Sequence, residues 1–160
     1  MKIDKIQALR GPNIWSVQRK KLIQMRLDLE EMEERPTNLI DGFRERIEAM
    51  FPTMIEHRCS EGCRGGFFSR IDKGTWMGHV IEHIALEIQT LAGMETGFGR
   101  TRETKTPGVY NVVFSYIEEN VGVFAAESAV AIAEALIAGT DYDLEADIQK
   151  MRVIRDRVRL

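Results

Sequence analysis

The sequence predicts a single α+β domain in which a mixed or antiparallel sheet packs against about three helices. Three segments carry this prediction. Residues 22–29 alternate between apolar and polar side chains, which is typical of a half-buried strand. Residues 75–93 repeat apolar side chains at helical spacing, and residues 97–119 have the pattern of a β-hairpin. At 160 residues the chain is long enough for one domain with its own core.

The first two elements are expected to be strands. Residues 2–10 are short and mixed in character, and Gly11-Pro12 predicts a turn directly after them. In residues 22–29 the alternation assigns one side of the strand to the core, namely Ile23, Met25, Leu27 and Leu29.

The next segment is predicted to be a helix over residues 39–51. Its apolar residues recur at helical spacing, and Pro52 is expected to end it. Residues 53–59 are expected to form a further strand. Residues 61–74 are rich in glycine, which favours a mobile or ligand-facing loop.

The second half of the chain is predicted to be helix, hairpin, helix. For residues 75–93 the expected N-cap is Thr75 and the expected stop is Gly93. The hairpin turns at residues 105–108, and an alanine-rich helix over residues 121–138 is expected to end at Gly139. Residues 139–160 are charged and look helical, with little to bury, and are interpreted as a linker helix.

Composition and charge exclude several classes of protein. The net charge is −3, from 22 basic and 25 acidic side chains, so a general nucleic-acid binder is not expected. We found no apolar run of about 18 residues, and therefore expect no membrane span. The first residues lack the apolar core of a signal peptide. The two cysteines are therefore expected to be reduced in a cytoplasmic protein, as incidental thiols in a loop.

Residues 78–83, GHVIEH, hold the strongest functional motif. His79 and His83 are four residues apart, so on a helix their imidazoles are neighbours and can share one zinc ion. Glu82 is offset from both and suits a general base that takes a proton from water. H-x-x-E-H is the reverse of the zincin motif and occurs in inverzincin peptidases. The alternative is the solvated polar face of an ordinary helix.

A catalytic zinc usually has a third protein ligand. We favour Glu127, because it lies among alanine and other small residues, where a carboxylate without a partner is costly to bury. Glu134, on nearly the same helix face, is the runner-up. Glu87 suits a supporting position next to a ligand. The other candidates are Glu118, Glu119, His57 and Cys59.

Two arginines in the hairpin are candidate substrate-binding residues. Arg100 and Arg102 carry guanidinium groups, which bind carboxylates in a bidentate manner. The alternative is a solvated hairpin, and it is the stronger one for Arg102. The glycines at residues 62, 65 and 66 do not follow a strand and open a helix as a phosphate loop requires. We therefore expect no ATP site in this segment.

Several long motifs resemble one known family. The stretches LRGPNIWS, LIQMRLDLE, EHRCSEGCRGGFFSR, GTWMGHVIEHIALEIQTLAGM and GFGRTRETKTPGVYNVVFSYIEE occur in the order found in the N-terminal domain of cyanophycin synthetases. The resemblance covers residues 1–138. It implies that residues 139–160 lead toward an ATP-grasp domain and a Mur-ligase-like domain, both absent from this sequence.

The resemblance also implies a substrate and an activity. Members of the family make cyanophycin, a polyaspartate backbone with arginine on each side chain. For this segment the family implies polymer binding and, in some members, metal-dependent cleavage of the polymer into short primers. The other domains and, in the full-length protein, further copies of the chain are expected partners.

The resulting hypothesis is a zinc-dependent peptidase acting on cyanophycin. His79, His83 and Glu127 hold the metal, Glu82 activates water, and Arg100 orients a substrate carboxylate. The alternatives are a non-catalytic module that tethers the polymer and a structural domain that supports oligomer assembly.

Overall fold

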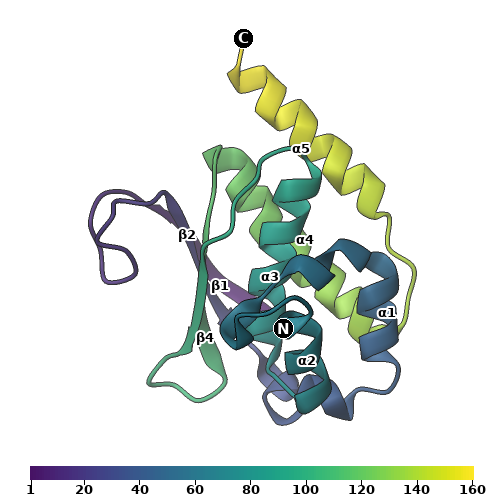
Figure 1. Cartoon of the computed structure of the whole chain (residues 1–160). Helices are drawn as coiled ribbons and strands as arrows, with labels where there is room; N and C mark the ends of the chain where they lie inside the picture. The colour runs from purple at the N-terminus through teal and green to yellow at the C-terminus, as the bar shows by residue number, and fades with distance from the viewer.

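One four-stranded sheet organises the protein, and the computed structural model describes all residues from 1 to 160 (Figure 1). The strands are β1 (Lys2–Leu9), β2 (Leu22–Asp28), β3 (Gly99–Glu103) and β4 (Val109–Ser115). They lie in the order β1-β2-β4-β3, and every neighbouring pair is antiparallel. The predicted α+β class with an antiparallel sheet is confirmed.

The alternation in β2 divides the sheet into a core face and an outer face. Ile23, Met25 and Leu27 are fully buried and belong to the main core. Gln24 and Arg26, between them, lie on the opposite side and are partly or fully exposed. A single strand therefore sets which face of the sheet the helices cover.

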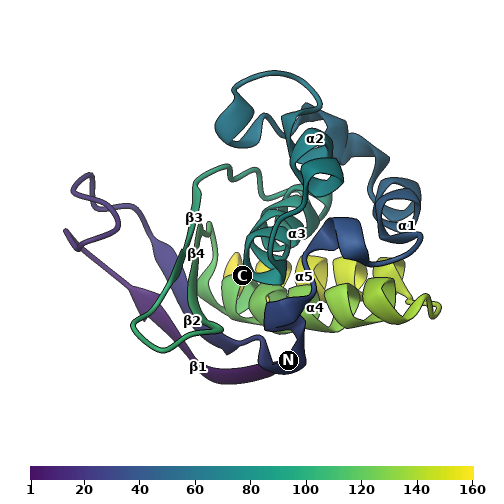
Figure 2. The ribbon, with the colours of Figure 1, turned by 90° about the horizontal axis from the view of Figure 1, so that it is seen from below.

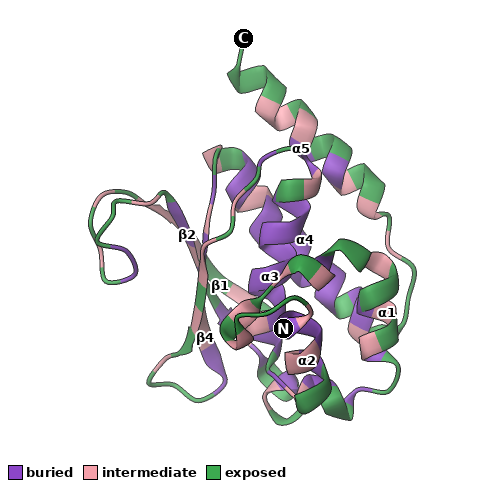
Figure 3. Ribbon diagram, viewed as in Figure 1, coloured by how far each residue is buried: buried purple, intermediate pink, exposed green.

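Two helices cover the core face of the sheet. α3 (Met77–Leu91) packs on β3 and β4, and α4 (Glu119–Ala138) packs on β1 and β2 (Figure 2). Both helices are largely buried (Figure 3). By length and composition α4 is apolar enough to cross a membrane, and its packing between the sheet and other helices accounts for that apolar character.

The segment between β2 and α3 departs from the sequence prediction. The predicted helix is present as α1 (Phe43–Met50) and ends before Pro52. The strand predicted over residues 53–59 is wrong, because the chain there forms short 3-10 helices at Pro52–Glu56 and Cys59–Glu61. Proline at the first position of a helical turn is favourable, since its missing N–H is unpaired there in any case.

The glycine-rich segment is also ordered. It contains α2 (Gly66–Lys73), whose apolar face buries Phe67, Phe68 and Ile71. A Cβ atom on Gly66 would overlap the carbonyl oxygen of Arg58. Glycine is present here because two backbone segments approach closely, and the expectation of a loop over residues 61–74 is wrong for its second half.

The C-terminal helix α5 (Leu144–Val158) packs against α4 and α3. Ile148 and Met151 are its buried residues. Arg152 donates to the carbonyl oxygen of Leu91 at 3.1 Å, and Arg155 donates to that of Ala92 at 2.6 Å. These bonds satisfy carbonyl groups that the end of α3 leaves without helical partners.

Candidate metal centre

The polar side of α3 lines a cleft. Side chains there are nearly inaccessible, since Glu82, His83 and Glu87 are only 6%, 7% and 4% exposed. The cleft has a volume of about 1370 Å³, and only 5 of its 23 lining residues are apolar. Buried ionisable groups around a polar cavity are typical of functional sites. A solvated helix face is therefore not what the motif forms.

Three potential metal-binding atoms converge at one point of this cleft. The Nε2 atoms of His79 and His83 are 3.1 Å apart, and Cys59 Sγ lies 3.2 Å from His79 Nε2. The three donor atoms all lie within 4.8 Å of one another. Cys59 has a positive φ of 55°, which is unfavourable for a side chain with a Cβ. Such strain concentrates at functional sites, where the surroundings fix it.

Hydrogen bonds on the far side of each ring aim the Nε2 atoms at this point. His79 Nδ1 lies 3.0 Å from Thr75 Oγ1, which can accept its proton. His83 Nδ1 lies 2.8 Å from His57 Nδ1. His57 Nε2 in turn lies 2.7 Å from Glu87 Oε2, and Thr53 donates to the same carboxylate.

This chain of contacts determines where the ring protons are. A carboxylate only accepts, so His57 donates from Nε2 and keeps a lone pair on Nδ1. His83 then donates from Nδ1 to that lone pair, and its own lone pair is on Nε2. Carboxylate–histidine pairs of this kind orient metal-binding imidazoles in many proteins.

Burial keeps the two imidazoles of α3 neutral. Loss of solvent lowers the pKa of His79 to about 4, and the charge of Arg70 contributes in the same direction. Burial also lowers the pKa of His83 well below its usual value, with smaller contributions from His79 and His57. Phe67 stacks on the His83 ring with centroids 4.3 Å apart, which excludes water from one side.

Glu87 behaves differently from a carboxylate that is merely buried. Burial alone would raise its pKa, but hydrogen bonds from His57 and Thr53 outweigh that effect and lower it. Glu87 is therefore ionised at neutral pH, as the proton assignment above requires.

The donor set fits a zinc ion. Two neutral imidazole nitrogens and one thiol sulfur are the ligand types that zinc prefers, and three protein ligands leave a position open as catalytic sites require.

Glu82 lines the same cleft and has a strongly shifted pKa. Burial raises the pKa of its carboxyl to about 7, and a hydrogen bond from Thr101 Oγ1 to Oε2 at 2.6 Å partly opposes this. β3 passes so close to Glu82 that a Cβ on Gly99 would overlap the carboxylate. The carboxyl is thus held between α3 and β3 and exchanges protons near neutral pH.

The structure does not bring the favoured third ligand to the histidines. Glu127 is exposed on α4 and is absent from the cleft lining. Glu134 is also exposed and contacts the N-terminal amine at 3.2 Å, Glu118 caps α4, and Glu119 pairs with Arg10. Small residues around Glu127 pack on neighbouring elements, while Glu127 itself points to solvent. Cys59, a weaker alternative in the sequence, occupies the third position.

The two hairpin arginines lie in different places. Arg100 lines the cleft, with its guanidinium carbon 5.7 Å from the centre of the Phe98 ring. Arg102 is exposed on β3 and does not line the cleft. Arg100 therefore has the position expected of a substrate-binding residue, and Arg102 does not reach the metal centre.

Sequence reasoning named Glu87 for a supporting position and His57 as a candidate ligand, but it did not connect them with each other or with Thr53. The available signal was the histidine count, because all three histidines of the chain meet at this site. Cys63, four residues after Cys59, is exposed and outside the cluster, so the spacing of the two cysteines gave no guide.

Comparison with known proteins identifies the family. Residues 24–138 match the model of the cyanophycin synthase-like N-terminal domain. The cyanophycin synthetase of Geminocystis herdmanii is 54% identical over 156 residues, which is 98% of this chain and 18% of that protein. A cyanophycin synthetase from a Synechocystis species is 54% identical over 155 residues, covering 95% of this chain and 18% of the relative. The cyanophycin synthetase of Trichormus variabilis is 52% identical over 155 residues, which is 95% of this chain and 17% of that protein.

The chain thus spans less than a fifth of the length of these relatives, at 18% or 17% of each. The family match covers β4, α3 and α4 completely, together with the loops that carry Cys59 and His57. On this evidence the chain belongs to the family of cyanophycin synthase-like N-terminal domains.

Proposed function

We propose that this domain is a zinc-dependent peptidase that cleaves cyanophycin, the polymer named in its relatives, and supplies short primers for polymerisation. The observation that supports it most is the convergence of the donor atoms of His79, His83 and Cys59 within 4.8 Å of one another, in the cleft that Glu82 also lines. These residues would hold the ion, and Glu127 has no part in the proposal.

When bound, a zinc ion at these donors supplies Lewis acidity, which polarises a carbonyl group and lowers the pKa of water. Glu82 takes a proton from the water whose oxygen attacks the amide carbon. It then gives that proton to the leaving nitrogen as the carbon–nitrogen bond breaks, so the carboxyl returns to its initial state. In the metal-free chain burial raises the pKa of Glu82 to about 7. A cation nearby lowers that pKa, so at neutral pH the carboxylate is ionised and able to take the proton.

The remaining groups hold the reacting groups in place. Thr101 donates to Glu82 Oε2 at 2.6 Å and leaves Oε1 for the water. Arg100, at the edge of the cleft, is suited to bind a carboxylate of the polymer. Glu87 and His57 keep the His83 Nε2 lone pair directed at the ion.

The test uses this chain with purified cyanophycin. We expect cleavage with zinc, loss of cleavage with a chelator, and loss in Glu82→Gln while zinc still binds. Glu56→Gln is the matched control, because Glu56 is exposed at the rim of the same cleft and pairs with Arg64. Cys59→Ala is expected to lose both zinc and cleavage.

Two outcomes would contradict the peptidase. Binding of the polymer without cleavage by the zinc-loaded chain would leave a module that tethers cyanophycin. If the chain neither binds nor cleaves the polymer, a structural role in the assembly of the full-length protein remains. Cleavage that survives in Glu82→Gln would remove Glu82 as the base.

A further inference from the structure

The face of the sheet that no helix covers carries aligned cationic and amide side chains. The antiparallel register places Lys5 opposite Arg26, Arg26 opposite Asn111, and Asn111 opposite Arg102. The next row places Gln7 opposite Gln24, and Arg100 lies further along on β3. We call this surface the outer sheet face, and it comprises Lys5, Gln7, Gln24, Arg26, Arg100, Arg102 and Asn111.

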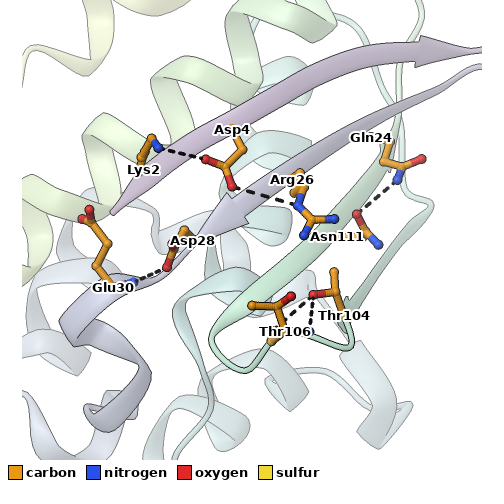
Figure 4. Close-up of polar contacts among 9 residues, drawn as sticks. All are labelled: Lys2, Asp4, Gln24, Arg26, Asp28, Glu30, Thr104, Thr106 and Asn111. Carbon is orange, nitrogen blue, oxygen red and sulfur yellow. Dashed lines mark hydrogen bonds and ion pairs between the residues drawn. The ribbon is translucent and has the colours of Figure 1, made fainter.

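The charges on the outer sheet face are not balanced. Lys5 and Arg26 are directly opposed, and like charges in that position destabilise an antiparallel pair. Two acids lie at one end of this face (Figure 4). Asp4 is 4.0 Å from Arg26 Nε and 3.4 Å from Lys2 Nζ, and Asp28 is opposite Lys2 and accepts from the backbone of Glu30. Lys5 and Arg102 form no ion pair. An anionic ligand would offset a repulsion that the fold alone leaves uncompensated.

The amides on this face form an ordered hydrogen-bonded row. Gln7 Nε2 donates to Gln24 Oε1 at 3.5 Å, and Gln24 Nε2 donates to Asn111 Oδ1 at 3.1 Å. The second of these bonds is drawn in Figure 4. With its oxygen engaged, Asn111 keeps its Nδ2 group as a donor. The amides line a shallow hollow of about 230 Å³ whose five lining residues, Lys5 and Arg26 among them, include no apolar side chain.

The outer sheet face continues toward the cleft across one edge strand. β3 ends the sheet, and its residues alternate between the two sides. Arg100 and Arg102 belong to the outer sheet face, while Thr101 between them bonds Glu82 on the other side. Arg100 also lines the cleft, so the two surfaces share a residue.

We propose that the outer sheet face binds a polymer with regularly repeated carboxylates and holds it while a neighbouring stretch enters the cleft over β3. Charge complementarity supports this occupant. Lys5 and Arg26 stand on neighbouring strands about 4.8 Å apart, and Arg102 lies two strands beyond Arg26, so the cations form a row to which several carboxylates of one chain can bind. In an aspartate–arginine polymer each arginine joined through its amine keeps a free carboxylate and its guanidinium, so each unit is neutral overall and the cations of the outer sheet face would pair with its carboxylates alone. Only the identity of the polymer rests on the proposed function.

The test measures binding with cleavage blocked. A fluorescent oligomer of several aspartate–arginine units is titrated into the chain in the presence of a chelator. We expect the triple variant Lys5→Gln/Arg26→Gln/Arg102→Gln to bind about tenfold more weakly and with a shallower salt dependence, since exposed ion pairs contribute modestly and add. The matched control removes three exposed cations elsewhere, as Lys105→Gln/Arg157→Gln/Arg159→Gln, and is expected to bind as the unmodified chain does.

A second measurement does not depend on the variants. Side-chain amide NMR signals of Gln24 and Asn111 are expected to shift as the oligomer is added. Equal binding by the two triple variants would overturn the proposal, and so would equally tight binding of a single-stranded oligonucleotide of the same length. Binding at this face without cleavage by the zinc-loaded chain would remove the peptidase and leave the surface assignment intact.

Discussion

His57 and His83 face each other through their Nδ1 atoms at 2.8 Å, although 26 residues separate them in the chain. His57 follows a 3-10 helix, and His83 lies in the middle of α3. One imidazole must donate an N–H to the other. Glu87, at 2.7 Å from His57 Nε2, decides which of the two is the donor. A carboxylate one turn further along α3 therefore controls which nitrogen of His83 carries the proton and leaves the lone pair on Nε2, next to His79 Nε2.

This relationship predicts that Glu87→Gln weakens zinc binding. The neutral amide no longer fixes the proton on His57 Nε2, so the direction of the hydrogen-bond chain to His83 is no longer determined. Partners of metal-binding histidines contribute about 10- to 100-fold in affinity, and we expect a loss in that range. The measurement is a competition titration of zinc against a chromophoric chelator.

The control is Glu56→Gln, which removes the same charge from the cleft rim without touching a histidine. Unfolding curves of both variants separate a weaker site from a weaker fold. Unchanged zinc affinity in Glu87→Gln would mean that His83 is oriented without this chain.

Cys59 provides a second prediction, concerning its sulfur. Cobalt substituted for zinc is expected to show a sulfur-to-metal charge-transfer band, which Cys59→Ala lacks. Zinc affinity should fall in that variant by more than the roughly 100-fold expected of a supporting residue, since a direct ligand is removed. Cys63→Ala should keep the band, because Cys63 is exposed and outside the cluster. A band that persists in Cys59→Ala would exclude Cys59 as a ligand.

The periodic parts of the fold could be predicted from sequence. The alternation of residues 22–29, the helix over residues 75–93 and the helix ended by Gly139 all appear near the predicted bounds, as β2, α3 and α4. In each case the pattern repeats over several residues, and one face is buried. The strand predicted over residues 53–59 is wrong, because seven residues of mixed polarity are too few to show a period that distinguishes a strand from a helical turn.

The site was predictable only as far as its residues are local. His79, Glu82 and His83 share one helix, so spacing alone was enough to place them on a common face. The third donor comes from another element, and no spacing rule connects Cys59 to α3. Glu127 was favoured from its apolar neighbours, yet a helix packed on several sides still exposes one stripe, and Glu127 lies there.

Glu127→Ala is accordingly expected to leave zinc binding unchanged. The side chain is exposed and is not part of the cleft lining, and such substitutions usually change stability by no more than about 0.5 kcal/mol. Zinc titration of this variant beside Cys59→Ala distinguishes the two candidates directly. A large loss in Glu127→Ala with Cys59→Ala unaffected would restore the ligand set that the sequence favoured.

The raised pKa of Glu82 predicts a pH-dependent stability for the metal-free chain. The folded state holds this proton up to a pKa of about 7, whereas the unfolded chain releases it near 4.5. Between these values the folded state binds more protons, so raising the pH costs stability, by about 3 kcal/mol in the limit of full ionisation. The amide in Glu82→Gln cannot ionise, so this variant does not lose that stability as the pH rises.

The stability of Glu82→Gln relative to the unmodified chain should therefore increase from pH 4.5 to pH 8. Urea unfolding in the presence of a chelator measures it, since a bound cation would favour the ionised carboxylate. The lowered pKa of His79 acts equally in both proteins and cancels from the comparison. Parallel pH profiles would show that the carboxyl of Glu82 is well solvated.

Gly99→Ala tests whether cleavage depends on the position of the Glu82 carboxylate, because it moves that group without changing its chemical identity. A Cβ on Gly99 would overlap the carboxylate, so the carboxylate must move from the position in which it accepts from Thr101. We expect a folded protein that binds zinc normally, is destabilised by about 1–3 kcal/mol, and has lost most of its cleavage activity. Gly97→Ala is the matched control, because a Cβ there meets no atom within 4 Å. Normal cleavage by Gly99→Ala would show that the close approach of β3 to Glu82 is not needed to position the base.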